Sequence, residues 1–240
     1  MISAENIEIA FTSIDDVFLN TPQCQSEELS ALLGVSLICK VETANPIGCF
    51  KGRGVDWLMQ NRQDITHVVT ASSGNFGQAV AYSGRRSDTR VEVFVPANAN
   101  QSKITAMERL GAHVHLHGHD FDAAKNEAIK SAESKGITFL EDGREVEIAE
   151  GAGTIGLEIG RYPGSIDIIY VPVGNGALVN GIGSWCKAKL PMTKVIGVCA
   201  EGAPAMERSW RNGKVIVTDE VNTIADGLAC RVPVPESLPP

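Results

Sequence analysis

Short runs of β-branched and apolar residues alternate with segments of helical periodicity along most of the chain, from about residue 36 onward. Gly or Pro stands at most of the joints between them, as expected at turns. Strand and helix repeated at this spacing predict right-handed crossovers between parallel strands, with helices covering both faces of each sheet. We therefore expect an α/β protein built from two parallel-sheet domains. The expected strands are 35–42, 66–71, 91–96, 112–117, 137–140, 166–173 and 194–200.

The segments between these strands show the apolar spacing of amphipathic helices. The run 167–173 is apolar almost throughout, which predicts a central parallel strand buried on both faces. In open α/β sheets, ligands bind beyond the carboxyl ends of the strands, so we expect the functional residues in loops that follow strands. The expected helices are 53–62, 75–86, 101–110, 120–135, 150–161 and 177–189.

Composition and charge limit the partners that this chain can have. Its 240 residues are enough for a substantial core, and a hydrophobic content of 43% is ordinary for a globular protein. The net charge of −8 argues against a nucleic-acid or anionic-membrane partner. The first residues show no secretory signal, and the six cysteines form no C-x-x-C pair. We expect a cytoplasmic protein with reduced thiols and no membrane partner.

One histidine-rich strand raises the question of a metal ion. His113, His115, His117 and His119 recur with a period of two, which places them on one face if the strand persists. Neutral imidazoles so arranged could bind a transition metal. The pattern favours a plainer interpretation, with Val114 and Leu116 in the core and the histidines on a solvated face. We therefore expect no metal site.

The stretch NPIGCFKGRG, residues 45–54, places Lys51 directly after Phe50 and among three glycines. Lys51 lies just ahead of the expected helix 53–62, where the unpaired N–H groups carry partial positive charge. That field disfavours an ammonium and favours the neutral amine that a Schiff-base lysine needs. The alternative is an ordinary solvated lysine, since lysine is rarely buried.

A second loop follows the expected strand 66–71 and contains Ser72, Ser73, Gly74 and Asn75. Small hydroxyls and backbone N–H groups at the start of a helix form an anion site that would suit a substrate carboxylate. The Asn75 amide could hold a neutral oxygen. The alternative is an ordinary helix N-cap.

A third loop, within residues 171–183, contains Gly174 and Gly176 ahead of a helix expected to start near Ala177. Such a loop can bind a phosphate through backbone N–H groups. It has neither the Lys-Ser/Thr of a Walker A loop nor the spacing G-x-G-x-x-G, so the phosphate of a bound cofactor fits better than a nucleotide. The alternative is a tight turn. An amine, a carboxylate loop and a phosphate loop together indicate pyridoxal 5′-phosphate.

The sequence resembles the fold-type II pyridoxal-phosphate-dependent enzymes, within them the threonine/serine dehydratase and serine racemase group. The family's lysine motif is matched by residues 49–54, its Ser-x-Gly-Asn loop by 72–75 and its glycine-rich phosphate loop by 174–178. Lesser matches are NTPQCQSEEL at 20–29 and TIADGLACR at 223–231. The resemblance runs in unbroken order from about residue 12 to residue 236.

The resemblance implies a role for each residue of the three loops. Lys51 would hold the cofactor as the internal aldimine and later move the α-proton. Phe50 would pack near the cofactor ring, and Asn75 would hydrogen-bond its 3′-oxygen. The remaining residues would bind the substrate carboxylate (Ser72, Ser73, Gly74), bind the cofactor phosphate (Gly174, Asn175, Gly176, Ala177, Leu178) or lie near the cofactor (Gly227).

The resemblance also implies an architecture and an activity. A large cofactor-binding domain would comprise residues 1–55 and 146–240, and a small domain residues 56–145. The activity would be that of a lyase that deaminates L-threonine or L-serine to a 2-oxo acid and ammonia, in a homodimer. Racemisation and β-replacement are alternatives within the family.

The chain also departs from the family pattern. Phe76 stands where dehydratases commonly have histidine. The family's large domain continues past residue 240 and there supplies a Ser, Thr or Cys to the pyridine nitrogen, and none of the residues up to Pro240 matches that motif. We therefore expect a large domain that is short at its C-terminus. Three explanations stay open: the chain is a fragment, the partner of the pyridine nitrogen comes from elsewhere, or the protein binds the cofactor but is catalytically deficient.

Overall fold

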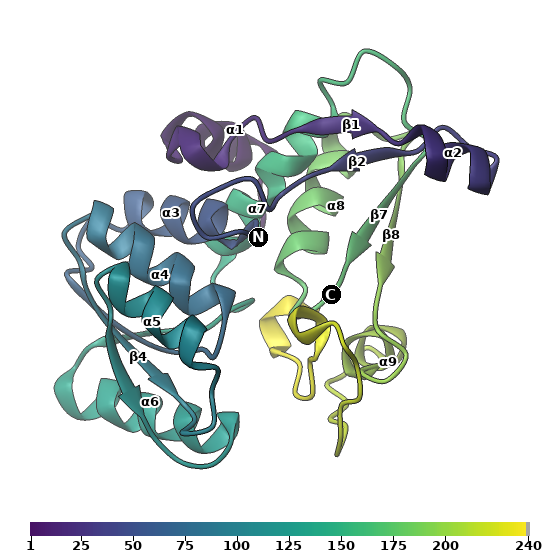
Figure 1. The fold of residues 1–240 in the computed structure, drawn as a ribbon. Helices are drawn as coiled ribbons and strands as arrows, with labels where there is room; N and C mark the ends of the chain where they lie inside the picture. The colour runs from purple at the N-terminus through teal and green to yellow at the C-terminus, as the bar shows by residue number, and fades with distance from the viewer. Residues whose placement is uncertain (239–240) are drawn as a thin grey trace.

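The computed structural model describes residues 1–238 and divides into two halves, seen left and right in Figure 1. The left half contains a parallel four-stranded sheet in the order β5-β4-β3-β6, formed by β3 His67–Ala71, β4 Arg90–Val95, β5 His113–Leu116 and β6 Thr138–Leu140. Helices cover both faces of this sheet, because successive side chains of each strand point to opposite faces and pack against different helices. Val68 and Val93 pack in one core with residues of α4 (Asn75–Arg86) and α5 (Gln101–Arg109), whereas Val69 and Phe94 pack against α6 (Phe121–Lys135).

The right half contains a parallel pair of strands, β7 (Ile168–Pro172) and β8 (Lys194–Val198), with α8 (Ala177–Lys189) against one face. Two helices, α3 (Lys51–Asn61) and α7 (Val146–Ile159), lie between the halves. Their backbones approach closely, since a Cβ added at Gly151 would lie 2.4 Å from the carbonyl oxygen of Arg53. The remaining elements are α1 Ala4–Ser13, η1 Asp16–Phe18, β1 Gln23–Gln25, α2 Glu27–Leu33, β2 Ile38–Lys40, α9 Ala205–Asn212, η2 Asp226–Leu228 and η3 Pro235–Ser237.

The predicted α/β class with parallel sheets is confirmed, and the six predicted helices are present as α3 to α8. The largest shift in a helix start is that of α7, which begins at Val146, four residues ahead of the prediction. Helices α1, α2 and α9 were not predicted. The sequence signal of α2 is weak for a physical reason: the helix has no buried residue and so needs no apolar stripe.

Three expectations about strands are wrong. The segment 35–42 yields only β2, which pairs antiparallel with β1 instead of joining a parallel sheet. Strand β7 is buried on one face only, since Tyr170 is 62% exposed while Val171 is buried. Both faces of β7 are apolar, so its sequence lacks the alternation that would reveal the difference. In β5, an edge strand, Leu116 is 59% exposed instead of lying in the core.

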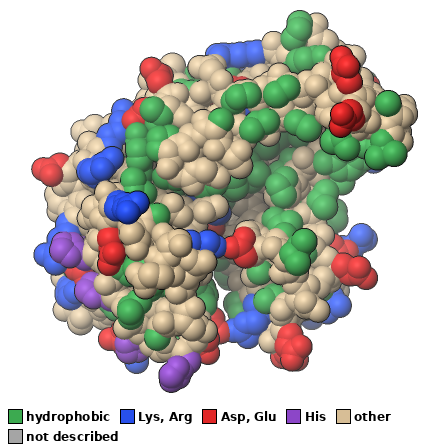
Figure 2. Space-filling model, in the orientation of Figure 1, with side chains coloured by type: hydrophobic (Ala, Val, Ile, Leu, Met, Phe, Trp, Pro, Cys, Tyr) green, Lys and Arg blue, Asp and Glu red, His purple; other side chains and the backbone are tan. Residues whose placement is uncertain are grey.

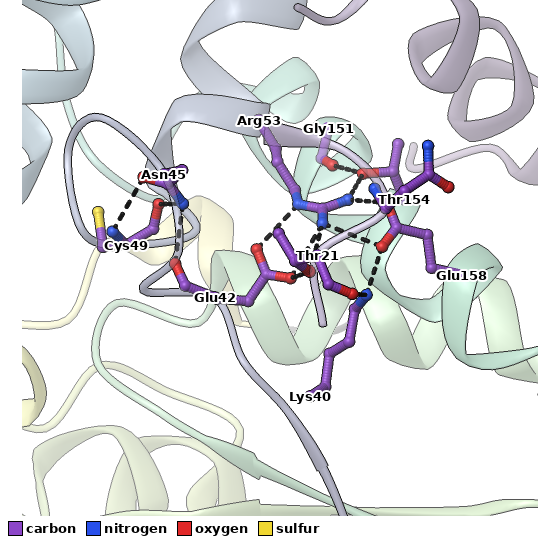
Figure 3. A network of polar contacts seen from close by, with 10 residues as sticks. Thr21, Lys40, Glu42, Asn45, Cys49, Arg53, Gly151, Thr154 and Glu158 are labelled. Carbon is purple, nitrogen blue, oxygen red and sulfur yellow. Dashed lines mark hydrogen bonds and ion pairs between the residues drawn. The ribbon is translucent and has the colours of Figure 1, made fainter. Parts of the chain in front are cut away.

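A buried network of charged and polar groups joins the N-terminal segment to the two central helices (Figure 3). The guanidinium of Arg53 is fully buried and donates to both carboxylate oxygens of Glu42, at 2.9 Å each. It also donates to both oxygens of Glu158, at 2.6 and 3.1 Å, and to the hydroxyls of Thr21 and Thr154. Lys40 is paired with Glu158 at 2.5 Å. Burying these charges is favourable only because each one has partners.

Replacing Arg53 with Met, which has a similar length, should lower the free energy of unfolding by about 3–5 kcal/mol, because Glu42 and Glu158 lose their buried cation. Urea denaturation followed by circular dichroism measures the change. The matched control is Arg211→Met, which removes an exposed arginine paired with Glu207 and should cost less than about 1 kcal/mol. A loss for Arg53→Met no larger than that of the control would contradict this account.

The Glu158 carboxylate should make the stability depend on acid pH. Burial by itself would raise the pKa of Glu158, but Arg53 and Lys40 outweigh it and hold the pKa below its ordinary value. A lowered pKa stabilises the fold above the unfolded-state pKa of about 4.3, and that stabilisation is lost as the pH falls through the folded-state value. Glu158→Gln should therefore lose less stability than wild type between about pH 5 and pH 3. Urea titrations at each pH test this, with Glu201→Gln as the control for an exposed carboxylate.

Candidate active site

A cavity of about 280 Å³ lies at the carboxyl ends of three strands, as expected for an α/β protein. Asn75 reaches it from the start of α4, which follows β3, Asp142 from the loop after β6, and Gly174 from the loop after β7. Residues 48–51 at the start of α3 and residues 227–228 complete most of its wall. Figure 2 shows the molecule hollowed between its two halves on one face. The lining therefore comes from segments that are far apart in the sequence.

Lys51 is the first residue of α3 and lines the cavity. Its Nζ lies 4.9 Å from the centroid of the Phe50 ring and 2.6 Å from Oδ2 of Asp142. Only about a fifth of its side chain is exposed (18%), so the interpretation of Lys51 as a solvated surface lysine is wrong. The amine is held at the cavity between an aromatic ring and a carboxylate.

The turn that precedes Lys51 is held by Asn45. Oδ1 of Asn45 accepts the backbone N–H of Ile47 at 3.1 Å, and its Nδ2 donates to the carbonyl oxygens of Glu42 and Cys49 at 2.8 and 3.0 Å. Cys49 also lines the cavity, and burial raises the pKa of its thiol although the N–H of Lys51 opposes the shift. Cys49 therefore presents a neutral thiol beside the lysine.

The glycine loop after β7 brings bare backbone to the cavity. A Cβ at Gly174 would lie 2.6 Å from the carbonyl oxygen of Gly227, so only glycine allows this approach. Gly176 has φ +92°, a left-handed conformation that side chains disfavour, and α8 begins at Ala177. Within residues 1–238, no side chain caps the start of α8, which leaves the N–H groups of its first turn for an anion.

The loop after β3 is placed differently from the other two. Oγ of Ser72 accepts the N–H groups of Gly74 and Gly77, at 3.2 and 2.9 Å, so this hydroxyl serves as a cap for α4. Ser73 is exposed, and neither serine nor Gly74 lines the cavity. Asn75, the first residue of α4, does line it.

The cavity thus brings together most of the residues singled out in the sequence, namely Phe50, Lys51, Asn75, Gly174, Asn175, Gly176, Ala177, Leu178 and Gly227. It also contains residues that sequence reasoning missed, among them Glu42 and Asp142. A signal for Asp142 was present, since it lies two residues beyond an expected strand end, where ligands of α/β sheets bind. Among residues 1–238, no group of three His, Cys, Asp or Glu side chains is arranged to hold a metal ion. The helices of this range include none with the length and apolar character needed to cross a bilayer.

Residues 14–239 match the family of pyridoxal-phosphate-dependent enzymes, and the chain belongs to that family. It is 35% identical over 226 residues to a threonine dehydratase of Nicotiana attenuata, a match that covers 93% of this chain and 38% of that protein. It is 34% identical over 236 residues to an L-threonine ammonia-lyase of Thermotoga maritima, covering 97% of this chain and 59% of that one. The chain therefore spans less than two thirds of the length of either relative.

Solved structures give the same assignment. The processed form of threonine deaminase isoform 2 from Solanum lycopersicum superposes with a TM-score of 0.89 at 33% identity, over 96% of this chain and 68% of that one. Maize serine racemase superposes with a TM-score of 0.89 at 28% identity, over 95% of this chain and 70% of the other. The predicted membership of the fold-type II group of threonine/serine dehydratases and serine racemases is thereby confirmed.

The residues present fit pyridoxal 5′-phosphate, the cofactor of this family. The cofactor is an aldehyde on an aromatic ring with a phosphate, and the cavity offers an amine next to a phenyl ring. It also offers a glycine loop for the phosphate. A side chain has no room at Gly174, and the positive φ of Gly176 disfavours one.

Gly176→Ala should weaken cofactor binding by about tenfold, because an alanine is strained by roughly 1–2 kcal/mol at positive φ and would turn the N–H groups of the loop. Its Cβ would also approach Cε of Met206 at 2.9 Å. Titration of the purified chain with pyridoxal 5′-phosphate measures the dissociation constant. Gly183→Ala, in α8 with nothing near its Cβ position, is the control and should keep the wild-type value. Equal affinities for the two variants would refute a phosphate role for this loop.

Proposed function

We propose that this chain contains the cofactor site of an ammonia-lyase that deaminates L-threonine or L-serine to a 2-oxo acid and ammonia. The observation that carries the proposal is that the amine of Lys51 faces the same cavity as the glycine loop 174–178. Similarity to threonine dehydratases over nearly the whole chain supports the choice of substrate.

Each lining residue then has a role that its position supports. Lys51 would hold the cofactor through Nζ and move the α-proton of the substrate, and Phe50 would pack near the cofactor ring. Asn75 would donate a hydrogen bond to the 3′-oxygen of the ring. When bound, the cofactor supplies an electrophilic carbonyl and an electron-withdrawing ring that stabilises negative charge on the substrate.

The two glycine-bearing segments hold the phosphate end of the cofactor. The backbone N–H groups of residues 174–178 bind the phosphate, and Gly227 packs against Gly174 beside it.

The substrate carboxylate binds at the start of α4 in this proposal. The hydroxyl of Ser72 accepts two backbone N–H groups and keeps its own hydrogen to donate. Ser72, Ser73 and Gly74 therefore receive the carboxylate at the edge of the cavity, next to Asn75, which lines it. Racemisation is the second candidate reaction, because maize serine racemase superposes as well as the threonine deaminase does.

We also propose a division into two domains. The four-stranded sheet with α4, α5 and α6 lies within residues 56–145, and α7, α8, β7 and β8 lie after residue 145, which supports a small domain at 56–145 and a large one formed by 1–55 with 146–240. The homodimer, the cytoplasmic location and the absence of a nucleic-acid partner stay predictions.

The test is cofactor attachment by Lys51 in the purified chain. Wild type mixed with pyridoxal 5′-phosphate should develop the absorbance of a lysine-bound cofactor, and Lys51→Ala should lose that absorbance completely. Lys214→Ala, an exposed lysine outside the cavity, should behave as wild type. If Lys51→Ala keeps the absorbance, the assignment of Lys51 is wrong.

Product analysis tests the reaction itself. Incubation with L-threonine or L-serine should yield the 2-oxo acid, measured by reduction with NADH and lactate dehydrogenase or by hydrazone formation. If the cofactor absorbance forms and D-serine accumulates without 2-oxo acid, the racemase alternative holds. If neither product forms, the chain binds the cofactor without completing the reaction.

A further inference from the structure

Asp142 makes a contact with Lys51 that none of the roles above explains. It lies in the loop 141–145 between β6 and α7, and its Oδ2 is 2.6 Å from Nζ of Lys51. Both side chains are largely buried, with 18% of Lys51 and 16% of Asp142 exposed. The carboxylate therefore touches the atom that must become bonded to the cofactor, and water screens the pair only partly.

The loop that carries Asp142 is held independently of Lys51. The carbonyl oxygen of Gly143 accepts the hydroxyl of Ser237 at 2.7 Å. The neighbouring Glu141 is paired with Lys125 of α6, and Arg144 donates its backbone N–H to the carbonyl oxygen of Glu141 at 3.2 Å. Asp142 is thus placed at the cavity by the fold, so its contact with Lys51 needs no rearrangement.

The other charged groups near the cavity are already neutralised. Among the described residues that line it, the titratable ones are Glu42, Cys49, Lys51 and Asp142. Glu42 is bound to Arg53 and Thr21, and burial raises the pKa of Cys49 and keeps it a neutral thiol.

In the part of the chain that the structure describes, the titratable groups close to Gly227 and Leu228 add no unpaired charge to the cavity. From the C-terminal segment, Cys230 is also neutral, since burial raises its pKa to about 11. Asp226, next to Gly227, is paired with Lys103 of α5 at 2.5 Å. Asp142 is therefore the carboxylate whose charge acts on Lys51.

We propose that Asp142 is a positioning residue for Lys51: its carboxylate orients the lysine amine in the cavity and stabilises a proton on Nζ. This inference rests on the proposed role of Lys51. Covalent attachment of the cofactor needs the neutral amine, so at neutral pH the extra proton on Nζ must first leave to solvent. Because Asp142 stabilises this proton, it slows attachment. In turnover, the same carboxylate stabilises the proton that Nζ accepts from the substrate α-carbon.

The pH dependence follows from the charge pair. Near neutral pH, removing the carboxylate takes away the partner that holds the amine as an ammonium. In strong alkali the amine has lost its proton with or without Asp142. The ratio of Lys51 reactivity between Asp142→Asn and wild type must therefore be largest near neutral pH and approach one at high pH. A change in access to Lys51 would instead alter its reactivity by the same factor at every pH.

The first experiment needs no cofactor. Brief acetylation with acetic anhydride from pH 7 to 11, read by mass spectrometry, reports the neutral fraction of each lysine, with Lys214 as internal standard. Asp142→Asn should increase labelling of Lys51 at pH 7, because the amine loses the carboxylate that lies 2.6 Å from Nζ. The increase should shrink steadily as the pH rises toward 11. Glu141→Gln, which removes a carboxylate of the same loop that pairs with Lys125, should label as wild type.

A second readout is the rate at which pyridoxal 5′-phosphate attaches, followed by absorbance over the same pH range. The ratio of rates between Asp142→Asn and wild type should fall toward one with rising pH in the same way. If circular dichroism shows that Asp142→Asn is unfolded, Asp142→Ser takes its place in both experiments.

The inference is overturned if the labelling of Lys51 is equal in Asp142→Asn and wild type at every pH, or differs by a constant factor. Failure of the proposed function would give a different result. If the proposed role of Lys51 is wrong, Lys51→Ala keeps the cofactor absorbance, but the labelling of Lys51 in Asp142→Asn is unaffected because that experiment contains no cofactor.

Discussion

The buried guanidinium of Arg53 joins the parts of the chain that place Lys51. It lies two residues after the lysine in α3 and binds Glu42, at the end of the N-terminal segment, and Glu158 in α7. An ion of this kind tolerates burial only when its donors are satisfied, so the positions of both carboxylates are restricted by it. Through Glu42 the constraint reaches the turn at Asn45, which immediately precedes the lysine (Figure 3).

The cavity depends on this arrangement because its wall is assembled from separate segments. The amine comes from the start of α3, the glycine loop from the end of β7, and the carboxylate of Asp142 from the loop after β6. Close approach of backbones at Gly151 and Gly174 brings these segments within reach. The same cavity then contains the amine and the first-turn N–H groups of α8, which are the groups that a phosphate-bearing aldehyde requires. It also contains Asp142, the counter-ion of that amine.

Much of the fold and of the candidate site could be predicted from local signals. Helices α4 and α8 begin at Asn75 and Ala177 as their glycine-containing loops indicated, and the alternation of strands and helices predicted parallel sheets. The prediction failed where the signal was not local. The sequence of β7 is apolar on both faces, and only the three-dimensional arrangement leaves Tyr170 exposed. For Ser72 the sequence left open a carboxylate ligand or a helix cap, and the structure shows that its Oγ accepts the N–H groups of Gly74 and Gly77.

By itself, the sequence determined the class of fold and the chemistry of three loops, because periodicity, turn residues and motif spacing act over a few neighbouring positions. It could not determine which charges meet. Lys51 and Asp142 are 91 positions apart, and Arg53 and Glu158 are 105 apart. Whether such groups pair depends on how helices and loops pack, since the energy of an ion pair depends on distance and burial and not on sequence order. Only the tertiary structure decided that the lysine amine has a carboxylate partner.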